Sequence, residues 1–443
     1  MADFASQLHN LMTRIGGPGS LEALERLSGG ANMESWAFVW RGEAYVLRRA
    51  PSAEFMADRP LDHTDEAALV RAAFAAGVKA PEVLGVLEPS DAMGTGYIMR
   101  RVDAEVRPAV IVASPPPALI EDLGRELARI HAIPRHTIPA AIPMMDTAAA
   151  LTELKARFLA YGGDRPVIAL AIRWCEDHIP APVSPVLVHG DYRMGNVMVD
   201  AKGLAVVLDW ELAHLGDPHE DLAFGCMAVW RFGELDKPAF GIGSLEDYFA
   251  AYEAEGGATI DPERFRFWLI YRTLWWALGC LEMGEAWRSG ADRSVERVVV
   301  GRRTAEQELD LVALLEDDAT ADERAARLVL ADLAAPLPTG EPTNGEIITA
   351  VRDWIEASIK PTAKGHAKFE AVVAMNALGI VMRDIEAGTR AEDRALAASL
   401  LTGQTTLAEP GLLGRLRRAA LGKCAVDSPK YLARAAARSA WTA

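Results

Sequence analysis

Residues 188–196 read VHGDYRMGN, and residues 204–211 read LAVVLDWE. Two short apolar runs, at residues 185–188 and 204–208, end at these polar side chains, which is typical of buried strands that lead into functional loops. The first loop places Asp191 five positions before Asn196, and the second begins with Asp209. Two such loops on neighbouring strands could bring three oxygen-bearing side chains into one cleft. This part of the chain therefore indicates both the fold and the site.

The three side chains suit phosphoryl transfer from a magnesium nucleotide, because in that reaction the protein mainly positions the reactants and neutralises charge. Mg²⁺ prefers a few carboxylate or amide oxygens together with phosphate oxygens, so Asn196 and Asp209 are candidate ligands. Asp191 is the candidate to accept a hydrogen bond from a substrate hydroxyl and to orient it for attack. A single aspartate at a strand end is more often a turn former, so this hypothesis depends on the whole set.

The first hundred residues predict a small antiparallel sheet that carries one helix. The turn at residues 41–43 is typical of a hairpin, and Gly77 occupies a usual helix-stop position. The expected segments are a helix at residues 8–24, extended runs around residue 26 and at residues 36–40 and 45–49, a helix at residues 65–76, and extended runs at residues 81–87 and 96–102.

Helical periodicity dominates the rest of the chain, at residues 119–131, 147–177 and 245–315. An acidic stretch at residues 316–323 and a proline-containing loop at residues 336–342 bracket a domain boundary. We therefore expect three domains, at residues 1–102, 103–316 and 325–443, of which the last is all helical.

Charge restricts the partners of the protein. Its 443 residues carry a formal net charge of -16, so nucleic acid and anionic membranes would be repelled. The segment from Gly411 onward is the exception, with seven Lys and Arg against one acid. We expect these basic helices to lie against an acidic body.

The four cysteines, Cys175, Cys226, Cys280 and Cys424, lie far apart and show no metal-ligand spacing. This favours reduced thiols and a cytoplasmic location. The N-terminal stretch lacks a basic segment followed by an apolar run, so no secretory signal is expected. No apolar stretch is long enough to predict a membrane span.

The ordered residues His189, Gly190 and Asp191, then Asn196 and Asp209, resemble the motifs of the aminoglycoside phosphotransferase and choline kinase family. The branch found fused to acyl-CoA dehydrogenases in some proteins is especially similar. The resemblance extends over roughly residues 20–315. It implies an α+β, bilobal protein-kinase-like fold with an N-terminal antiparallel sheet lobe and a mainly helical C-terminal lobe. The all-α domain that follows resembles a helical module of unknown function.

The resemblance also implies roles for individual residues. Arg48 stands where the family has a phosphate-binding lysine, and Glu66 is its expected partner. His189 and Asp221 would support the catalytic loop. The remaining nucleotide-binding candidates are Gly29, Gly30 and Asn32 in a phosphate-covering loop, and Met99 and Arg101 in a hinge that meets the base through backbone groups.

The function implied is that of a small-molecule kinase that uses Mg²⁺ and ATP or GTP and phosphorylates an alcohol group. The branch favours a metabolic hydroxyl, with an acyl-CoA or a related acid as the candidate. Two alternatives stay open, namely an aminoglycoside-resistance enzyme and a catalytically inactive nucleotide-binding scaffold, which Arg48 in place of lysine would suit. We expect Glu211 to be solvated and His131 to be a satisfied core histidine. The oligomeric state is not indicated.

Overall fold

The computed structural model describes residues 2–27, 33–50, 61–292, 295–327, 344–387 and 394–442. The chain divides into two compact units, each continuous in space but not in sequence. The first unit comprises Met1–Met145 with Ala181–Phe265, and the second comprises Asp146–Pro180 with Arg266–Ala443. The predicted site residues that the structure describes all belong to the first unit. The three-domain division expected from the sequence stays a prediction.

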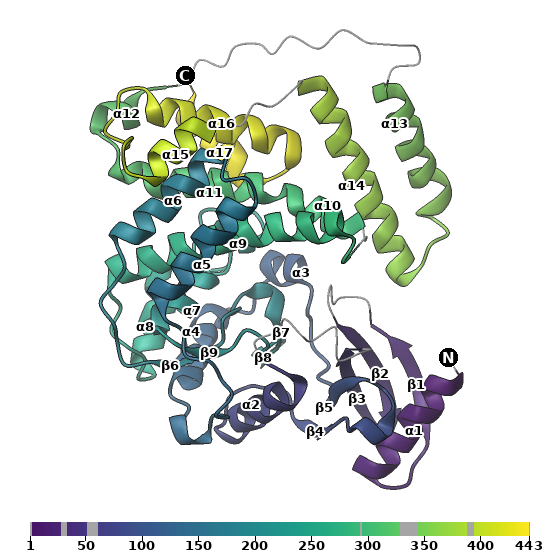
Figure 1. Ribbon diagram of the computed structural model, residues 1–443. Helices are drawn as coiled ribbons and strands as arrows, with labels where there is room; N and C mark the ends of the chain where they lie inside the picture. The colour runs from purple at the N-terminus through teal and green to yellow at the C-terminus, as the bar shows by residue number, and fades with distance from the viewer. Residues whose placement is uncertain are drawn as a thin grey trace. The chain divides into compact units, whose positions relative to one another are not determined.

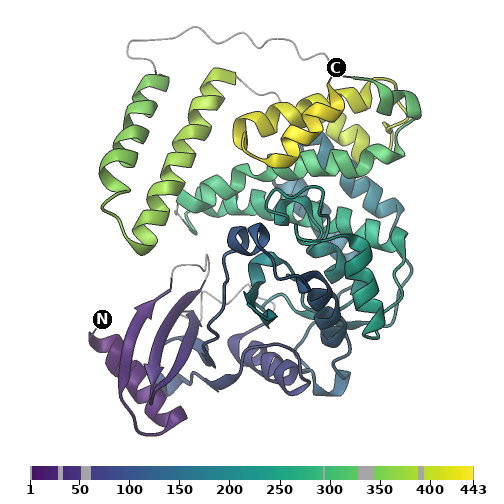
Figure 2. The same cartoon turned by 180° about the vertical axis from the view of Figure 1, so that it is seen from behind.

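The first unit begins with a five-stranded antiparallel sheet in the order β1-β2-β3-β5-β4, against which α1 packs (Figures 1 and 2). Its core includes Leu8 and Leu11 of α1 together with Phe38 and Leu47 of the sheet, all of them buried. The bounds are α1 Ala2–Gly16, β1 Leu21–Arg26, β2 Glu34–Trp40, β3 Glu43–Ala50, α2 His63–Ala75, β4 Val83–Val86 and β5 Thr95–Arg100.

The remainder of the first unit is mainly helical and carries two small two-stranded sheets, β6 with β9 and β7 with β8. Helix α4 packs on α8 and also contacts β6 and β8, so it lies beneath both loops of the predicted site. The bounds are α3 Pro108–Ala113, α4 Leu119–His131, β6 Val186–Val188, β7 Val197–Asp200, β8 Gly203–Val207, β9 His214–Gly216, α7 Pro218–Phe224 and α8 Leu245–Ala254.

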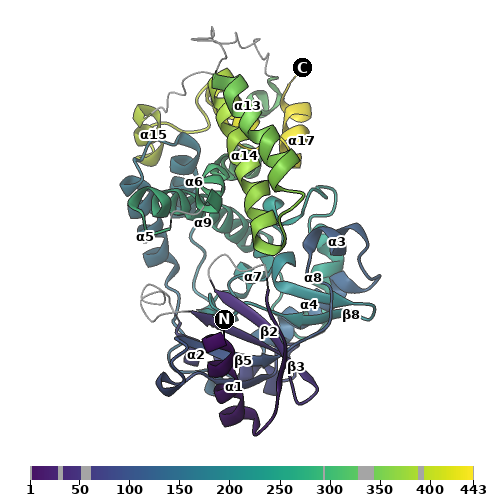
Figure 3. The same cartoon turned by 90° about the vertical axis from the view of Figure 1, so that its right-hand side faces the viewer.

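Helices joined by turns and loops make up the described part of the second unit. Helix α11 packs on α6, α16 and α17, and α13 runs beside α14, as Figure 3 shows. The bounds are α5 Thr147–Ala160, α6 Pro166–Asp177, α9 Pro262–Ser289, α10 Val295–Arg302, α11 Thr304–Leu315, α12 Ala321–Ala325, α13 Asn344–Trp354, α14 Gly365–Ala387, α15 Arg394–Leu401, α16 Leu412–Asp427 and α17 Leu432–Trp441; α9 starts in the first unit. No helix in the described ranges is both long and apolar enough to span a bilayer.

The basic C-terminal helix does lie against acidic residues, as expected. In the second unit Arg417 pairs with Glu316 at 2.8 Å, and Lys423 pairs with Glu308 at 3.0 Å. The expected α+β architecture is also found, and the helix predicted at residues 119–131 is α4 itself.

One predicted helix is wrong in its second half. The helix expected at residues 8–24 ends at Gly16, and Leu21 begins β1. Gly17 follows the helix with φ 74°, a left-handed conformation that glycine adopts easily, and Pro18 cannot continue a helix. The apolar residues beyond this break are therefore free to pair with β2.

Candidate active site

The two polar loops converge, as the sequence predicts. Nδ2 of Asn196 donates to Oδ2 of Asp191 at 2.5 Å and to its backbone oxygen at 3.0 Å. The backbone of Leu208 joins the loops, because its N–H donates to the Asn196 carbonyl at 2.7 Å and its carbonyl accepts from Nε2 of His189 at 3.0 Å. Asp209 follows directly, so the three oxygen-bearing side chains lie in one place.

Asp221 of α7 holds the loop that carries Asp191. Its carboxylate accepts the backbone N–H groups of His189 at 2.6 Å and Gly190 at 2.9 Å, and it lies 3.2 Å from Nε2 of His131. Burial alone would raise the pKa of Asp221, but these hydrogen bonds outweigh it and hold the pKa below its usual range. Gly190 has φ 81°, and a Cβ built there would collide with the Leu212 carbonyl. The loop geometry therefore requires glycine.

His189 is a fully buried bridge between the two loops. Since its Nε2 donates to the Leu208 carbonyl, its Nδ1 is the acceptor for the Asp191 N–H at 3.3 Å. Burial lowers the pKa of His189, so the ring stays neutral. This arrangement suits support of the loop and leaves the ring no free nitrogen for proton transfer.

Asp209 has an unusual backbone conformation. Its φ is 66°, in the left-handed region that non-glycine residues seldom occupy. Residues held in this way cluster at ligand sites, because the surrounding structure must compensate for the strain. Here Oδ1 of Asp209 lies 2.5 Å from Nη2 of Arg48. Burial alone would raise the pKa of Asp209, but Arg48 outweighs it and lowers the pKa.

Arg48 of β3 is surrounded by three carboxylates. Its Nη2 lies 2.8 Å from Glu211 as well as 2.5 Å from Asp209, and its Nε lies 3.6 Å from Glu66 of α2. The pairing of Arg48 with Glu66 is the contact expected from the sequence. The prediction for Glu211 is wrong, because this side chain is only 18% exposed and is paired with Arg48. The loop after β8 folds back onto β3, which sequence periodicity does not indicate.

The cluster around Arg48 carries more negative than positive charge. Burial raises the pKa of Glu66 to about 7, against the opposing effect of Arg48, and Asp209 and Glu211 add to the rise. The hydroxyl of Tyr97 donates to Oε1 of Glu66 at 3.0 Å. One guanidinium therefore pairs with three carboxylates, and a further cation could neutralise the excess negative charge of the site.

The donor set fits Mg²⁺ held jointly with a nucleotide. Both hydrogen bonds of the Asn196 side chain use Nδ2, so Oδ1 is the atom able to coordinate a cation, beside the Asp209 carboxylate. Within the described ranges no three His, Cys, Asp or Glu side chains are grouped to hold a metal by themselves. Such a site would rely on phosphate oxygens and water to complete six-fold coordination.

The other nucleotide-binding candidates are less well defined. Gly29, Gly30 and Asn32 lie outside the described residues. Met99 lies within β5 and is paired in register with both β3 and β4, while the N–H of Arg101 donates to the Ala44 carbonyl at 2.9 Å. Any contact of Arg101 with a base would thus use its carbonyl, and the roles of all five residues stay predictions.

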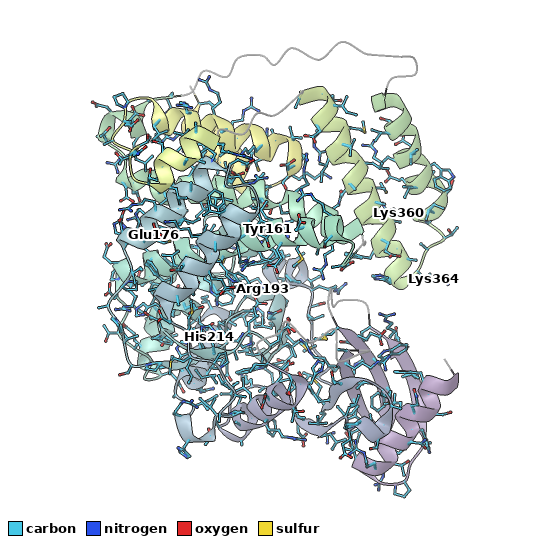
Figure 4. All side chains as sticks on the ribbon, viewed as in Figure 1. Tyr161, Glu176, Arg193, His214, Lys360 and Lys364 are labelled. Carbon is cyan, nitrogen blue, oxygen red and sulfur yellow. The ribbon has the colours of Figure 1, made fainter. Side chains whose placement is uncertain are left out.

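Arg193, labelled in Figure 4, is a site residue that the sequence did not single out. Its Nε donates to Oδ1 of Asp191 at 2.7 Å and its Nη2 to Oδ2 at 3.2 Å. Its Cζ lies 4.2 Å from the ring centroid of Trp230. Burial raises the pKa of Asp191, and Arg193 opposes that rise. Only the short spacing of Asp191 and Arg193 could have indicated the pair.

Two family profiles match the chain. The family described as "Phosphotransferase enzyme family" matches residues 23–268, which include every described site residue. A domain of unknown function, DUF6285, matches residues 361–431 in the second unit. The first match covers more than half of the chain.

The curated relatives are much longer proteins. The chain is 29% identical over 241 residues to acyl-CoA dehydrogenase family member 10 of Mus musculus, which covers 47% of this chain and 21% of that protein. It is 25% identical over 251 residues to acyl-CoA dehydrogenase family member 11 of Gallus gallus, covering 50% of this chain and 32% of that protein. The chain thus spans less than a third of the length of these relatives.

Solved structures share the fold. A putative aminoglycoside phosphotransferase from Ralstonia eutropha aligns with a TM-score of 0.57 at 22% identity, covering 70% of this chain and 98% of that one. A thermostable mutant of aminoglycoside phosphotransferase APH(4)-Ia, in complex with AMP-PNP and hygromycin B, aligns with a TM-score of 0.50 at 20% identity, covering 71% and 100%. The fold is therefore the protein-kinase-like α+β fold expected from the sequence.

Proposed function

This chain belongs to the phosphotransferase enzyme family, and from that premise we propose that it transfers the terminal phosphoryl group of ATP or GTP to a hydroxyl of a small metabolite. At the coarser level it is a phosphotransferase that acts on alcohol groups of small molecules. The observation that carries the finer proposal is the convergence of Asp191, Asn196 and Asp209 at the Leu208 backbone. These groups are the ones needed to orient an acceptor and to hold a metal nucleotide.

In this proposal Asp191 accepts the proton of the acceptor hydroxyl while the hydroxyl oxygen bonds to the terminal phosphorus. Asn196 and Asp209 would hold Mg²⁺, which when bound neutralises negative charge on the phosphates. Arg48 offers donors to the phosphates, and Glu66 limits the positions that its guanidinium can take. Arginine keeps the positive charge of the usual lysine, so the substitution is compatible with activity.

For the acceptor we propose a hydroxyl on an acyl-CoA or a related acid. The support is the similarity to acyl-CoA dehydrogenase family members 10 and 11, whose names associate this kind of sequence with acyl-CoA metabolism. For location we propose the cytoplasm, since Cys175, Cys226, Cys280 and Cys424 are all free and buried.

The test is a screen for phosphorylated product with Mg·ATP or Mg·GTP against hydroxyacyl-CoAs, hydroxy acids and aminoglycosides. Product from the hydroxyacyl substrates alone would support the proposal, and product from aminoglycosides alone would replace it with a resistance activity. Stabilisation by Mg·nucleotide with no product from any acceptor would favour the inactive scaffold.

The role of Asp191 is tested with Asp191→Asn, which keeps the shape of the side chain. Turnover should fall by about 10²–10⁴-fold while nucleotide affinity changes little, because Asp191 serves the acceptor. Asp317→Asn is the matched control, since Asp317 is a 75% exposed aspartate outside the site. Turnover of Asp191→Asn equal to that of the control would remove Asp191 from its assigned role.

A further inference from the structure

We propose that Arg193 serves two partners at once: one edge of its guanidinium orients Asp191, and its Nη1 donates to an oxygen of the phosphoryl group being transferred. This inference rests on the proposed function and adds a residue to that same site. Arg193 lies in the same loop as Asp191, and it binds that carboxylate through Nε and Nη2.

The first edge is already occupied. Nε and Nη2 of Arg193 form a fork on the two oxygens of Asp191, at 2.7 and 3.2 Å, and Asn196 takes Oδ2 at 2.5 Å. A carboxylate accepts about four hydrogen bonds, so three bonds leave roughly one direction free. That remaining direction is available to a substrate hydroxyl. Arg193 therefore fixes how Asp191 meets its acceptor.

The second edge is available to a ligand. Among the described residues Nη1 of Arg193 makes no hydrogen bond, although the side chain is only 22% exposed. It lies over Gly195, where a built Cβ would collide with Nη1. The absence of a side chain at Gly195 thus leaves space for Nη1. Among the described residues this strong donor has no protein acceptor.

The guanidinium is also held in its plane. Its Cζ lies 4.2 Å from the centroid of the buried Trp230 ring, a stacking contact that arginine makes readily. The preceding residue, Tyr192, is fixed on another side by its hydroxyl, which donates to the Leu123 carbonyl at 2.9 Å. A preorganised donor costs little reorganisation when charge develops beside it.

The anion that fits Nη1 is the phosphoryl group. Gly195, under Nη1, immediately precedes Asn196, the residue proposed to hold the metal that carries the nucleotide phosphates. The positive charge of Arg193 also acts on Asp209, which places it within electrostatic range of the second proposed ligand. If Asn196 and Asp209 hold the metal nucleotide, the phosphoryl oxygens, which gather charge during transfer, are the anion to which Nη1 would donate.

The reaction step balances without a further reactant. The acceptor oxygen forms a bond to the terminal phosphorus, the bond from that phosphorus to the bridging oxygen breaks, and its electron pair leaves with the nucleoside diphosphate. The hydroxyl proton passes to Asp191. Arg193 stays protonated throughout and keeps contact with both the carboxylate and the phosphoryl oxygens.

The first experiment measures binding and needs no acceptor. Wild type and Arg193→Met are titrated with Mg·ADP alone and with Mg·ADP plus aluminium fluoride, which mimics the phosphoryl group in transit. We expect Mg·ADP to bind both proteins equally, whereas the gain in affinity from aluminium fluoride should fall by about 10²-fold in Arg193→Met. Arg193→Lys should recover part of the gain, because it restores a cation without the fork.

A matched control is present in the chain. Arg107 forms the same two-residue fork with Glu105, at 2.9 and 2.7 Å, but its side chain is 72% exposed and lies outside the site. Arg107→Met should keep the full aluminium fluoride gain. An equal gain in Arg193→Met and Arg107→Met would overturn the inference while leaving the proposed function intact. Failure of wild type to bind Mg·ADP at all would instead count against the proposed function.

The second experiment uses turnover once an acceptor is known. Arg193→Met should lower kcat and kcat/KM together by about 10²–10³-fold with little change in nucleotide KM, as expected for a transition-state contact. Gly195→Ala should lower kcat because its methyl group displaces Nη1, and it should add nothing in the Arg193→Met background. A rise confined to the KM of an acidic acceptor, with the aluminium fluoride gain unchanged, would assign Nη1 to an acceptor carboxylate and overturn the phosphoryl assignment.

Discussion

Nη2 of Arg48 lies 2.5 Å from Oδ1 of Asp209, so a cation from the N-terminal sheet is bound to a carboxylate that lies 161 residues further along the chain. Both residues are proposed to meet the same nucleotide, Arg48 at the phosphates and Asp209 at the metal. This ion pair helps to hold Asp209 in its left-handed conformation, with φ 66°. Binding of Mg·nucleotide would give each of them a new partner.

Removing the charge of Arg48 should destabilise the protein. Arg48→Met leaves three buried or half-buried carboxylates without their shared cation, so we expect a loss of about 3–5 kcal/mol in the free energy of unfolding. Arg48→Lys should recover part of this loss. Urea unfolding measures both, with Arg100→Met as control, because Arg100 is in the same sheet but is 43% exposed and pairs with surface acids. Equal stability of Arg48→Met and Arg100→Met would show that the cluster does not need its cation.

Asp209→Asn should separate metal binding from folding. Asparagine tolerates φ 66° better than most residues, so the backbone can be kept while the charge is lost. For Asp209→Asn we expect Mg·ATP to stabilise the protein against heat no more than ATP with EDTA does. Wild type should lose turnover when EDTA removes the metal. A magnesium-dependent shift of wild-type size in Asp209→Asn would contradict the assignment of Asp209 as a ligand.

Glu66 should make stability depend on pH. Its pKa is about 7 in the folded protein against 4.5 ordinarily, so the folded state binds the proton more tightly. Its contribution is fully present below pH 4.5 and is lost as pH rises to about 7, by roughly 3 kcal/mol at 1.36 kcal/mol per unit.

The measurement is the free energy of unfolding of wild type and Glu66→Gln between pH 4.5 and 8. The stability of Glu66→Gln relative to wild type should increase across the window from pH 4.5 to 7 and then level off. Glu22→Gln, an exposed substitution in β1, is the control. Parallel curves for wild type and Glu66→Gln would mean that Glu66 is already ionised at low pH.

In the second unit, Glu308 should help to hold helix α16 in place. Its fully buried carboxylate accepts from Lys423 of α16 at 3.0 Å and from Arg165 at 3.1 Å. Burial alone would raise the pKa of Glu308, but these two cations outweigh it and lower the pKa. Glu308→Gln removes the negative charge that Lys423 and Arg165 share.

We expect Glu308→Gln to lower the free energy of unfolding by about 3 kcal/mol. Differential scanning calorimetry would show the loss, and Glu356→Gln is the matched control, since Glu356 makes only an exposed pair with Lys360 at 3.4 Å. Identical transitions for the two variants would mean that the Glu308 charge does not stabilise the packing of α16 on α11.

The sequence by itself determined the local structure around the site. Apolar runs that end at Asp191 and Asp209 predict the strands and loops, because side-chain pattern and turn chemistry act over a few residues. The same local logic gives α4 its bounds at Leu119 and His131. It failed at residues 21–24, because Gly17 and Pro18 prevent the helix from continuing although the apolar pattern extends beyond them.

Beyond the expected pair of Arg48 with Glu66, tertiary structure alone decided which charges meet at the site. The pairing of Glu211 with Arg48 and the stacking of Arg193 on Trp230 join segments far apart in the chain. Coulomb and packing energies depend on separation in space, and sequence spacing does not encode that separation. The motif therefore identified the carboxylates and the amide, whereas the fold brought Arg48 to Asp209 and supplied the buried surroundings that shift the pKa values.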